Sequence, residues 1–433
     1  MQGSPNVVIL ESNKSIRRYD IDWLRVILFG LLIWFHFAVF YFKQPEGIFG
    51  LPYFFVVSVM HQWRLAALFV ISGMGTAFAL RKRTWKQYVK ERLTRLGLPL
   101  LFTVYILFFG ILDFAENTAL LFSIFPDSEN MPYGHLWFVY NLLIYSIVLT
   151  PIFYHVKTNP NGSIMRLMRR ILRMKSGLGI LILPPVILSI NGILLKPWEF
   201  GEVGMWWEFP RYMIYFLIGF LLISAKNDYF QSLEKIRIPI TIITPLLAIF
   251  WFIFIILIDV PYVMEGGWVN EGYSPFSLKV IIASILQSFH AWFWCLLIFT
   301  WASKVLNKPG KYVSYLNESV YATYILHMHL TIILIVILAI MGIGFLPAMI
   351  IGTPVLIFGV LACFELVKRA SLLRPLFGIK GGREKVLELF PYNYTDDKSL
   401  HILFNLIFHT FALGLIVVLT LLMMGIDLSL IHI

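Results

Sequence analysis

Residues 22–42 read DWLRVILFGLLIWFHFAVFYF. Only Asp22, Arg25 and His36 interrupt this otherwise apolar and aromatic stretch. A helix needs about 20 apolar residues to cross the hydrocarbon core of a bilayer, so the stretch predicts a membrane-spanning helix. Its three polar residues need an explanation of their own, because ionisable groups are costly in hydrocarbon.

The remainder of the chain has the same character. Of its 433 residues, 59% are hydrophobic and 14% are charged, whereas roughly a quarter of the residues of a soluble protein are charged. This composition excludes an ordinary soluble protein and predicts an all-α, polytopic membrane protein with about eleven transmembrane helices. The predicted spans are 22–42, 59–80, 97–113, 135–154, 177–195, 208–225, 238–259, 279–303, 318–341, 345–366 and 402–425.

The basic residues predict the orientation of these spans, because Lys and Arg are retained on the cytoplasmic side of a membrane. With a cytoplasmic N-terminus, 29 of the 35 basic residues fall in segments on the inside, and only Lys43, Lys196 and Lys279 fall outside. Topology therefore explains the net charge of +11, and we expect no nucleic-acid partner. The C-terminus is predicted to lie outside.

The chain has two cysteines, Cys295 and Cys363, and both lie in apolar stretches. This placement supports neither a disulfide framework nor a thiolate metal site. We expect no metal.

Arg25 and His36 lie on one face of the first predicted helix. Eleven residues at about 100° each end about 20° past three full turns, and they separate the two side chains by about 16 Å along the axis. A cation at the inner end and a titratable base deeper in the membrane indicate a functional site. Alternatively, Arg25 reaches lipid phosphate or pairs with Asp22, and His36 makes a hydrogen bond between helices.

Further polar residues occur at similar depth in other predicted spans. Arg64 lies near the outer end of the second span, and the small pair Ser72-Gly73 follows deeper in, where it permits close backbone approach. His290 lies in the middle of the eighth span, and His327 and His329 lie in the ninth. A single such histidine is more often structural, and this is the favoured role of His290 and His329. Several at one depth nevertheless predict a polar cavity.

Arg92 and Arg95 immediately precede the third predicted span. Their spacing places them on one face of a helix, where two guanidinium groups can hold a phosphate through forked hydrogen bonds. Alternatively, the basic cluster to which they belong enforces topology and binds anionic lipid head groups.

Five short motifs occur along the chain. They are Tyr19 to Arg25 followed by His36, Leu68-Phe69-Val70-Ile71-Ser72-Gly73, Arg92-x-x-Arg95, His135-Leu136-Trp137-Phe138, and Ser319-Val320-Tyr321-Ala322-Thr323-Tyr324-Ile325-Leu326-His327. Each is weak alone, but the ordered set resembles the acyltransferase-3 family of membrane-bound acyltransferases over roughly residues 19–330. Within that family, residues 35–41 and the expected lack of an appended domain most resemble the glucan-biosynthesis protein C branch.

The resemblance implies a ten-helix acyltransferase domain at 22–366 in the plasma (bacterial inner) membrane. Such a domain transfers an acyl group, often acetyl or succinyl, from cytoplasmic acyl-CoA to a hydroxyl of a glycan or other acceptor outside. Residues 1–21 would form a cytoplasmic N-terminal segment, and 367–401 a cytoplasmic loop. Residues 402–433 would add a C-terminal transmembrane helix and tail to the usual ten. The sequence does not indicate an oligomeric state.

The resemblance also implies residue roles. His36 would be the essential histidine and Arg25 its companion, and Arg92 and Arg95 would contact the CoA phosphates. Neutral His36 can act as the general base for the acceptor hydroxyl. The competing mechanism forms a covalent acyl-histidine intermediate.

The other pocket candidates are less defined. The oxyanion of the reaction could be stabilised by Arg64, Ser72, Tyr324 or backbone N–H groups, and His327 belongs to the same predicted cavity. Glu318 either pairs with a cytoplasmic arginine, which is favoured, or contributes to donor binding. A transporter or flippase with a polar midplane site is the alternative function, although such folds often show internal repeats and none is visible here. A scaffolding membrane protein would need no intramembrane arginine.

Overall fold

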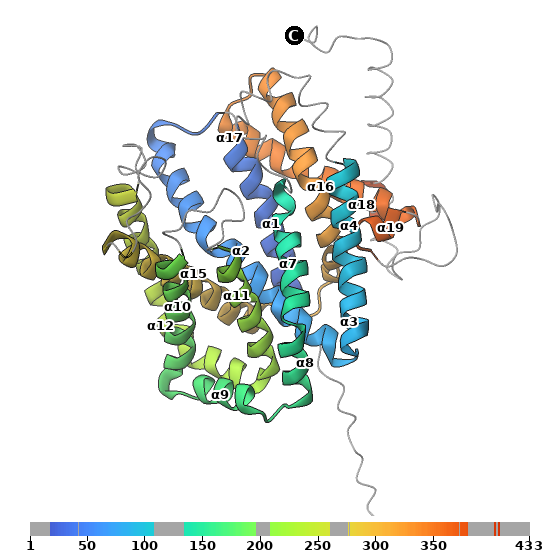
Figure 1. Ribbon diagram of the computed structural model, residues 1–433. Helices are drawn as coiled ribbons and strands as arrows, with labels where there is room; N and C mark the ends of the chain where they lie inside the picture. Colours follow the sequence, from blue (N-terminus) through green and yellow to red (C-terminus); the bar gives the residue numbers. More distant parts are fainter. Residues whose placement is uncertain are drawn as a thin grey trace, which may run out of the picture.

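The computed structural model describes residues 18–41, 43–107, 134–195, 208–259, 276, 278–371, 373–379, 402, 403, 406 and 407, and its architecture is all-helical (Figure 1). The helical segments are α1 (Tyr19–Phe40), η1 (Gly47–Phe49), α2 (Gly50–Arg81), α3 (Trp85–Arg92), η2 (Leu93–Gly97), α4 (Leu98–Phe102), η3 (Thr103–Leu107), η5 (Gly134–Leu136), α7 (Trp137–Val148), α8 (Thr150–Thr158), α9 (Ser163–Leu172), η6 (Lys175–Gly177), α10 (Leu178–Leu195), α11 (Glu208–Ser224), α12 (Lys226–Phe254), η7 (Ile255–Asp259), α15 (Leu278–Val305), α16 (Val313–Ile340), α17 (Phe345–Pro347), η8 (Ala348–Gly352), α18 (Thr353–Arg369) and α19 (Leu373–Leu376).

Seven helical segments in the described residues are long and apolar enough to cross a membrane. They are Tyr19–Phe40, Gly47–Arg81, Lys175–Leu195, Lys226–Ile258, Leu278–Val305, Val313–Ile340 and Phe345–Arg369. The pair α7 and α8 makes an eighth if its 50° bend is counted within one span. Pro151 enters the first turn of α8, and the missing N–H of a proline favours a bend at this point.

The structure therefore supports seven or eight of the eleven predicted spans. The sixth prediction, 208–225, corresponds to α11, which has 17 residues and carries Glu208 and Arg211 in its first turn. These charges shorten its apolar part. The third, 97–113, is described only as far as Leu107, and the eleventh, 402–425, lies almost wholly outside the described residues. Most of the predicted loop 367–401 also lies outside them.

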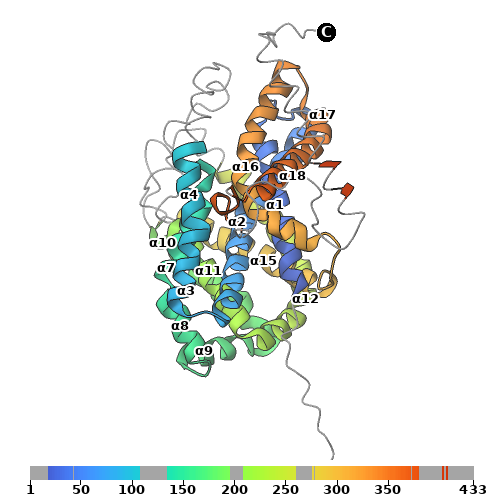
Figure 2. The same cartoon turned by 90° about the vertical axis from the view of Figure 1, so that its right-hand side faces the viewer.

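Two helix pairings position the centre of the molecule. α1 packs against α16 and also contacts α2, α15 and α18 (Figure 2). Arg25 and His36 on α1 hydrogen-bond to Asn317 and His327 on α16, respectively. The residue numbers rise in the same direction along both helices, so α1 and α16 are parallel.

The second pairing joins α2 and α11, which lie side by side along much of their length. A methyl group added to Gly73 would overlap the backbone carbonyl of Phe216, and one added to Gly219 would overlap that of Val70. Small residues allow this backbone contact between helices in a membrane. The close approach expected at Ser72-Gly73 is confirmed. Since Phe69 stacks on Tyr212 and Gly73 meets Phe216, α2 and α11 are also parallel.

The end of the bundle near α9 is rich in basic residues. α9 lies across the lower end of the molecule in Figure 1, where α2, α8, α11 and α12 also end or begin. Its apolar residues Met165 and Leu172 are buried, whereas Arg166, Arg170 and Arg173 are exposed or partly exposed. This is the amphipathic pattern of a helix that lies at an interface.

Candidate active site

A pair of histidines joins α1 to α16. His36 Nδ1 lies 2.9 Å from His327 Nε2, and the two rings stack with centroids 5.2 Å apart. His327 is fully buried, whereas His36 keeps some exposure. The predicted cavity histidine His327 is thus the direct partner of His36.

The backbone of α16 determines which nitrogens carry protons. His327 Nδ1 lies 2.6 Å from the carbonyl oxygen of Tyr324, which can only accept, so this nitrogen must donate. In a neutral ring the other nitrogen is then an acceptor. His327 Nε2 therefore accepts from His36 Nδ1–H, and His36 Nε2 is left with a free lone pair. The pair presents a base at one defined atom.

Tyr324 holds this arrangement in place. Its hydroxyl donates to the backbone carbonyl of His135, and its ring packs edge-on against Phe29 and Phe138. The His135 ring lies 5.1 Å from that of His327 and 6.1 Å from that of His329. Tyr324 therefore braces α16 against the start of α7, and its hydroxyl proton is engaged by a backbone acceptor.

Arg64 supplies positive charge beside the histidines. Its guanidinium lies 3.6 Å from the centroid of the Phe35 ring, and its charge acts on His36, His61 and His327. Arg64 is 2% exposed, and among the described residues its Nε and Nη1 have no hydrogen-bond partner. A buried guanidinium with unused donors is suited to an anion that forms nearby.

Arg25 lies on the same face of α1 as His36, nearer the start of the helix. Its Nη1 donates to Asn317 Oδ1 at 2.9 Å, and Asn317 Nδ2 donates to Asp22 Oδ1 at 3.1 Å. The Asn317 amide therefore links Arg25 to Asp22. Arg25 also lies beside Gly75 of α2, since a methyl group there would come within 3.1 Å of its Nη2. Glycine at this position leaves room for the guanidinium.

Arg92 is the last residue of α3, and Arg95 lies in the turn between α3 and α4. A capping box between Thr84 and Gln87 starts α3, and the helix continues into the π-helical turn η2, which contains Arg95. Arg92 packs over the Tyr88 ring with its guanidinium 4.9 Å from the centroid. The charge of Arg92 acts on Arg25, so Arg25 on α1 lies near the end of α3.

Arg95 has a carboxylate partner. Its Nη1 lies 3.3 Å from Glu91 Oε1, and Arg83 also pairs with Glu91, at 2.6 Å. Burial lowers the pKa of Arg95, Glu91 raises it, and the nearby Arg92 and Arg83 lower it further. One carboxylate therefore serves two arginines, which leaves the turn with surplus positive charge.

The structure separates other predicted residues from the histidine pair. Ser72 is half-buried on α2, about 12 Å further along the helix axis than Arg64. Glu318 pairs with Lys368 at 2.7 Å, so its favoured structural pairing is with a lysine rather than an arginine. His290 is fully buried and stacks on Trp251. In the part of the chain that the structure describes, no three His, Cys, Asp or Glu side chains are grouped to hold a metal ion.

Sequence reasoning did not assign site roles to His61, His135 or Asn317. His61 and Arg64 are three residues apart and therefore share a face of α2, a signal that was available. His135 opens a predicted span and Asn317 precedes one. Their closeness to His327 and Arg25 depends on how separate helices pack, which a hydropathy pattern does not contain.

A comparison with protein families identifies the family of this chain. A family model described as an acyltransferase domain, that of acyltransferase-3, matches residues 18–367. This chain belongs to the acyltransferase-3 family. No curated protein and no solved structure matches it.

Membership in the acyltransferase-3 family means that the chain is a membrane-bound acyltransferase. The matched residues include α1, α2, α16 and nearly all of α18, and thus the histidine pair and Arg64. The predicted family and enzyme class are confirmed. The transporter alternative gains no support, and the match does not distinguish the glucan-biosynthesis protein C branch from the rest of the family.

Proposed function

We propose that this acyltransferase-3 protein is an O-acyltransferase. It moves an acetyl or succinyl group from cytoplasmic acyl-CoA to a hydroxyl of a glycan or another extracytoplasmic acceptor. The observation that carries the proposal is the hydrogen bond between His36 Nδ1 and His327 Nε2, because it directs the lone pair of His36 Nε2 away from α16.

In the proposed reaction, His36 Nε2 accepts the proton of the acceptor hydroxyl as its oxygen attacks the thioester carbonyl. The carbonyl oxygen becomes an anion, and the unused donors of Arg64 stabilise it. When the carbon–sulfur bond breaks, the proton held by His36 passes to the departing CoA sulfur. The products are the acyl ester and CoA thiol, and His36 returns to its neutral form.

The donor site follows from charge and depth. Arg92 and Arg95 would bind the CoA phosphates at the inner mouth, where Arg95 pairs with Glu91 and Arg92 packs over the Tyr88 ring. Arg25, beside Arg92, would guide the donor toward His36. The axial distance of about 16 Å between Arg25 and His36 suits a long thioester donor that enters from the inside.

Helix directions support the proposed ten-helix core. Two membrane-spanning helices that run in the same direction must have an odd number of other membrane spans between them in the chain. Between the parallel helices α2 and α11, the segments α7–α8 and α10 provide two crossings, so a third is required. The helical stretch that continues from η2 through α4 and η3 is the available segment. Counting it together with α11 gives ten spans from α1 to α18, with a cytoplasmic N-terminus. The eleventh span and the assignment to the glucan-biosynthesis protein C branch remain predictions.

Replacement of His36 tests the proposal. His36→Ala protein, reconstituted in vesicles with radiolabelled acetyl-CoA or succinyl-CoA, should release no CoA thiol above background while remaining inserted and folded. Wild-type protein should release thiol in step with acceptor acylation. Near-normal transfer by His36→Ala would refute the role of His36. Label that stays covalently on wild-type protein and is absent from His36→Ala would instead support the acyl-histidine mechanism.

A further inference from the structure

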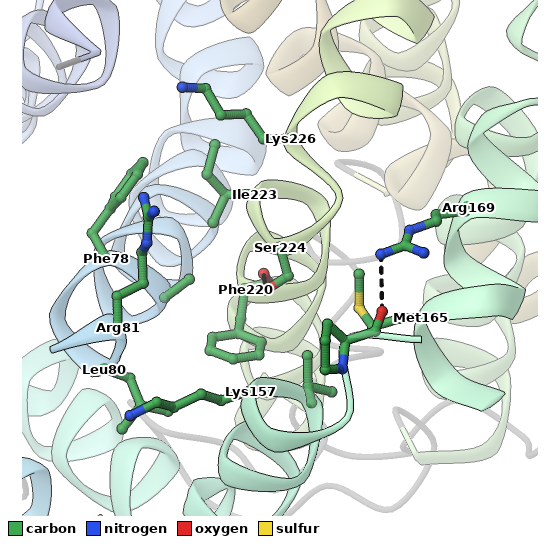
Figure 3. A pocket seen from close by; sticks show the side chains of 13 residues that line it. Phe78, Leu80, Arg81, Lys157, Met165, Arg169, Phe220, Ile223, Ser224 and Lys226 are labelled. Carbon is green, nitrogen blue, oxygen red and sulfur yellow. Dashed lines mark hydrogen bonds between the residues drawn. The ribbon is translucent and has the colours of Figure 1, made fainter. Parts of the chain in front are cut away.

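A pocket with a volume of about 360 Å³ lies at the α9 end of the bundle, away from the histidine pair (Figure 3). Five segments of the chain build it: the ends of α2, α8 and α11, part of α9 with the loop before it, and the start of α12. Neither the residues proposed for catalysis nor those proposed for donor binding line this pocket.

Its lining carries four cations, each from a different helix: Arg81, Lys157, Arg169 and Lys226. None of the described lining residues is Asp or Glu. Arg81 repels Lys226, and an anion bound between them would offset this repulsion.

Two of these cations are fixed by neutral acceptors. Lys157 Nζ donates to the Arg83 carbonyl at 2.7 Å. Arg169 donates to the Pro160 carbonyl at 2.9 Å, the contact drawn in Figure 3, and to Asn161 Oδ1 at 3.0 Å. Such bonds orient the side chains and leave their charge in place.

The other two cations are uncommitted. Within the part of the chain that the structure describes, the Arg81 and Lys226 side chains make no hydrogen bond or ion pair. Arg18 and Arg81 repel Lys226, and Asp20 attracts it, but Asp20 already pairs with Arg18 at 2.6 Å. The guanidinium of Arg81 and the ammonium group of Lys226 are therefore available to a ligand.

The wall of the pocket that α2 and α11 form is closely packed. Gly73, one helical turn before Ala77 of the lining, meets the backbone of α11, and Gly219 meets the backbone of α2 next to the lining residue Phe220. Phe220 also stacks on Phe153 with ring centroids 4.1 Å apart. A donor held in this pocket could not pass between α2 and α11 to reach His36.

Apolar side chains form much of the remaining lining. Among them are Leu80, Val156, Met165, Phe220 and Ile223. We propose that the pocket binds the phosphate group of a phosphate ester, with the head group of an anionic membrane lipid as the favoured source. Basic pockets between transmembrane helices on the cytoplasmic side suit such head groups, and the apolar wall would cover the glycerol end.

Lipid retention by the full-length protein tests this assignment without any acyl donor, so it can fail independently of the proposed transfer reaction. Protein in neutral detergent is mixed with phosphatidylglycerol or phosphatidylcholine of equal chain length, and bound lipids are counted by native mass spectrometry. The pocket variant is Arg81→Gln/Lys226→Gln. Its matched control is Lys304→Gln/Lys308→Gln, which removes the same charge from exposed residues at or just after the end of α15 that do not line the pocket.

We expect wild-type protein and the control to retain phosphatidylglycerol over phosphatidylcholine, and the pocket variant to bind it roughly tenfold more weakly. Arg81→Lys/Lys226→Arg should retain the lipid, which shows that loss in the first variant reflects charge rather than folding. Glycerol 1-phosphate or inorganic phosphate is added in a second arm. Displacement of the lipid by either supports recognition of phosphate alone, and failure to displace assigns the site to the whole lipid.

Three results would overturn the proposal: equal retention of the two lipids, equal loss in both glutamine variants, or a KM for acyl-CoA that rises in the pocket variant in proportion to the loss of lipid. The last result would make the pocket part of the donor site.

Discussion

At the scale of single residues, the chemistry of His36 depends on a side chain that itself need not touch substrate. The Tyr324 carbonyl makes His327 Nδ1 a donor, and this forces His36 to donate from Nδ1. One hydrogen bond to the backbone and one between the two histidine side chains thus select the reactive nitrogen. We regard His327 as a positioning residue for the proposed base.

Replacing His327 should separate this positioning role from a purely structural one. In His327→Leu, the acceptor for His36 Nδ1–H is lost, and we expect kcat to fall on the order of 10²-fold. His327→Gln keeps an amide oxygen that can accept from His36 and should recover part of the rate. The pH profile of kcat should shift in both variants. Equal kcat values and unchanged profiles would contradict the assignment.

Arg64 gives a second prediction at this scale. Its unused donors are proposed to meet the oxyanion, which exists only after attack on the thioester. Arg64→Gln should therefore lower kcat by roughly 10²-fold with little change in KM for the donor. Steady-state kinetics of the reconstituted protein measure this split. A large rise in KM at normal kcat would place Arg64 in donor binding instead.

The residue scale was the most accessible from the sequence. The spacing of Arg25 and His36 predicted a shared face, and both do contact α16. Of the two partners on α16, the sequence predicts His327 as a cavity residue but gives no signal for Asn317. Periodicity within one helix defines a face, but it carries no information on which helix packs there.

At the scale of helices, the contact between α2 and α11 separates the histidine cluster from the basic pocket. It depends on the absence of side chains at Gly73 and Gly219. Gly73→Ala should force the two backbones apart, and overpacking of this kind costs about 1–3 kcal/mol. We expect a lower unfolding temperature, measured by tryptophan fluorescence in detergent.

Gly30→Ala is the matched control, because a methyl group at Gly30 meets nothing within 4 Å. Alanine is the better helix former by about 0.8–1 kcal/mol, so the control should unfold at the same or a higher temperature. If the two variants lost stability equally, the close packing would not be responsible.

Hydropathy predicted most helices but not their irregularities. The predicted span 135–154 is divided by the 50° bend between α7 and α8. The predicted span 59–80 begins earlier, at Gly50, because residues 51–57 (LPYFFVV) are also apolar and continue the helix. The charges at the start of α11 interrupt its apolar window, although the helix lies against α2. Pro151 and the charges of α11 stand in the sequence, but an average of hydropathy over a whole span does not register such single residues.

At the scale of the whole molecule, the arrangement of parallel helices predicts which loops share a side. Single cysteines in a protein with Cys363 and Cys295 replaced would test this. Glu46→Cys, between α1 and α2, should react with an impermeant maleimide from outside the cell. Lys308→Cys, between α15 and α16, should react only after the membrane is permeabilised. Both positions are exposed, so the same labelling side for both would refute the proposed topology.

The same parallel pairing determines when the active site can exist. His36 and His327 are separated by 291 residues, and a ribosome adding about 5–20 residues per second needs roughly 15–60 s to make that stretch. During this interval α1 carries Arg25 and His36 without the partners that α16 provides. The chemistry is thus assembled near the end of synthesis, and a chain interrupted before α16 would insert most of its helices while having no completed histidine pair.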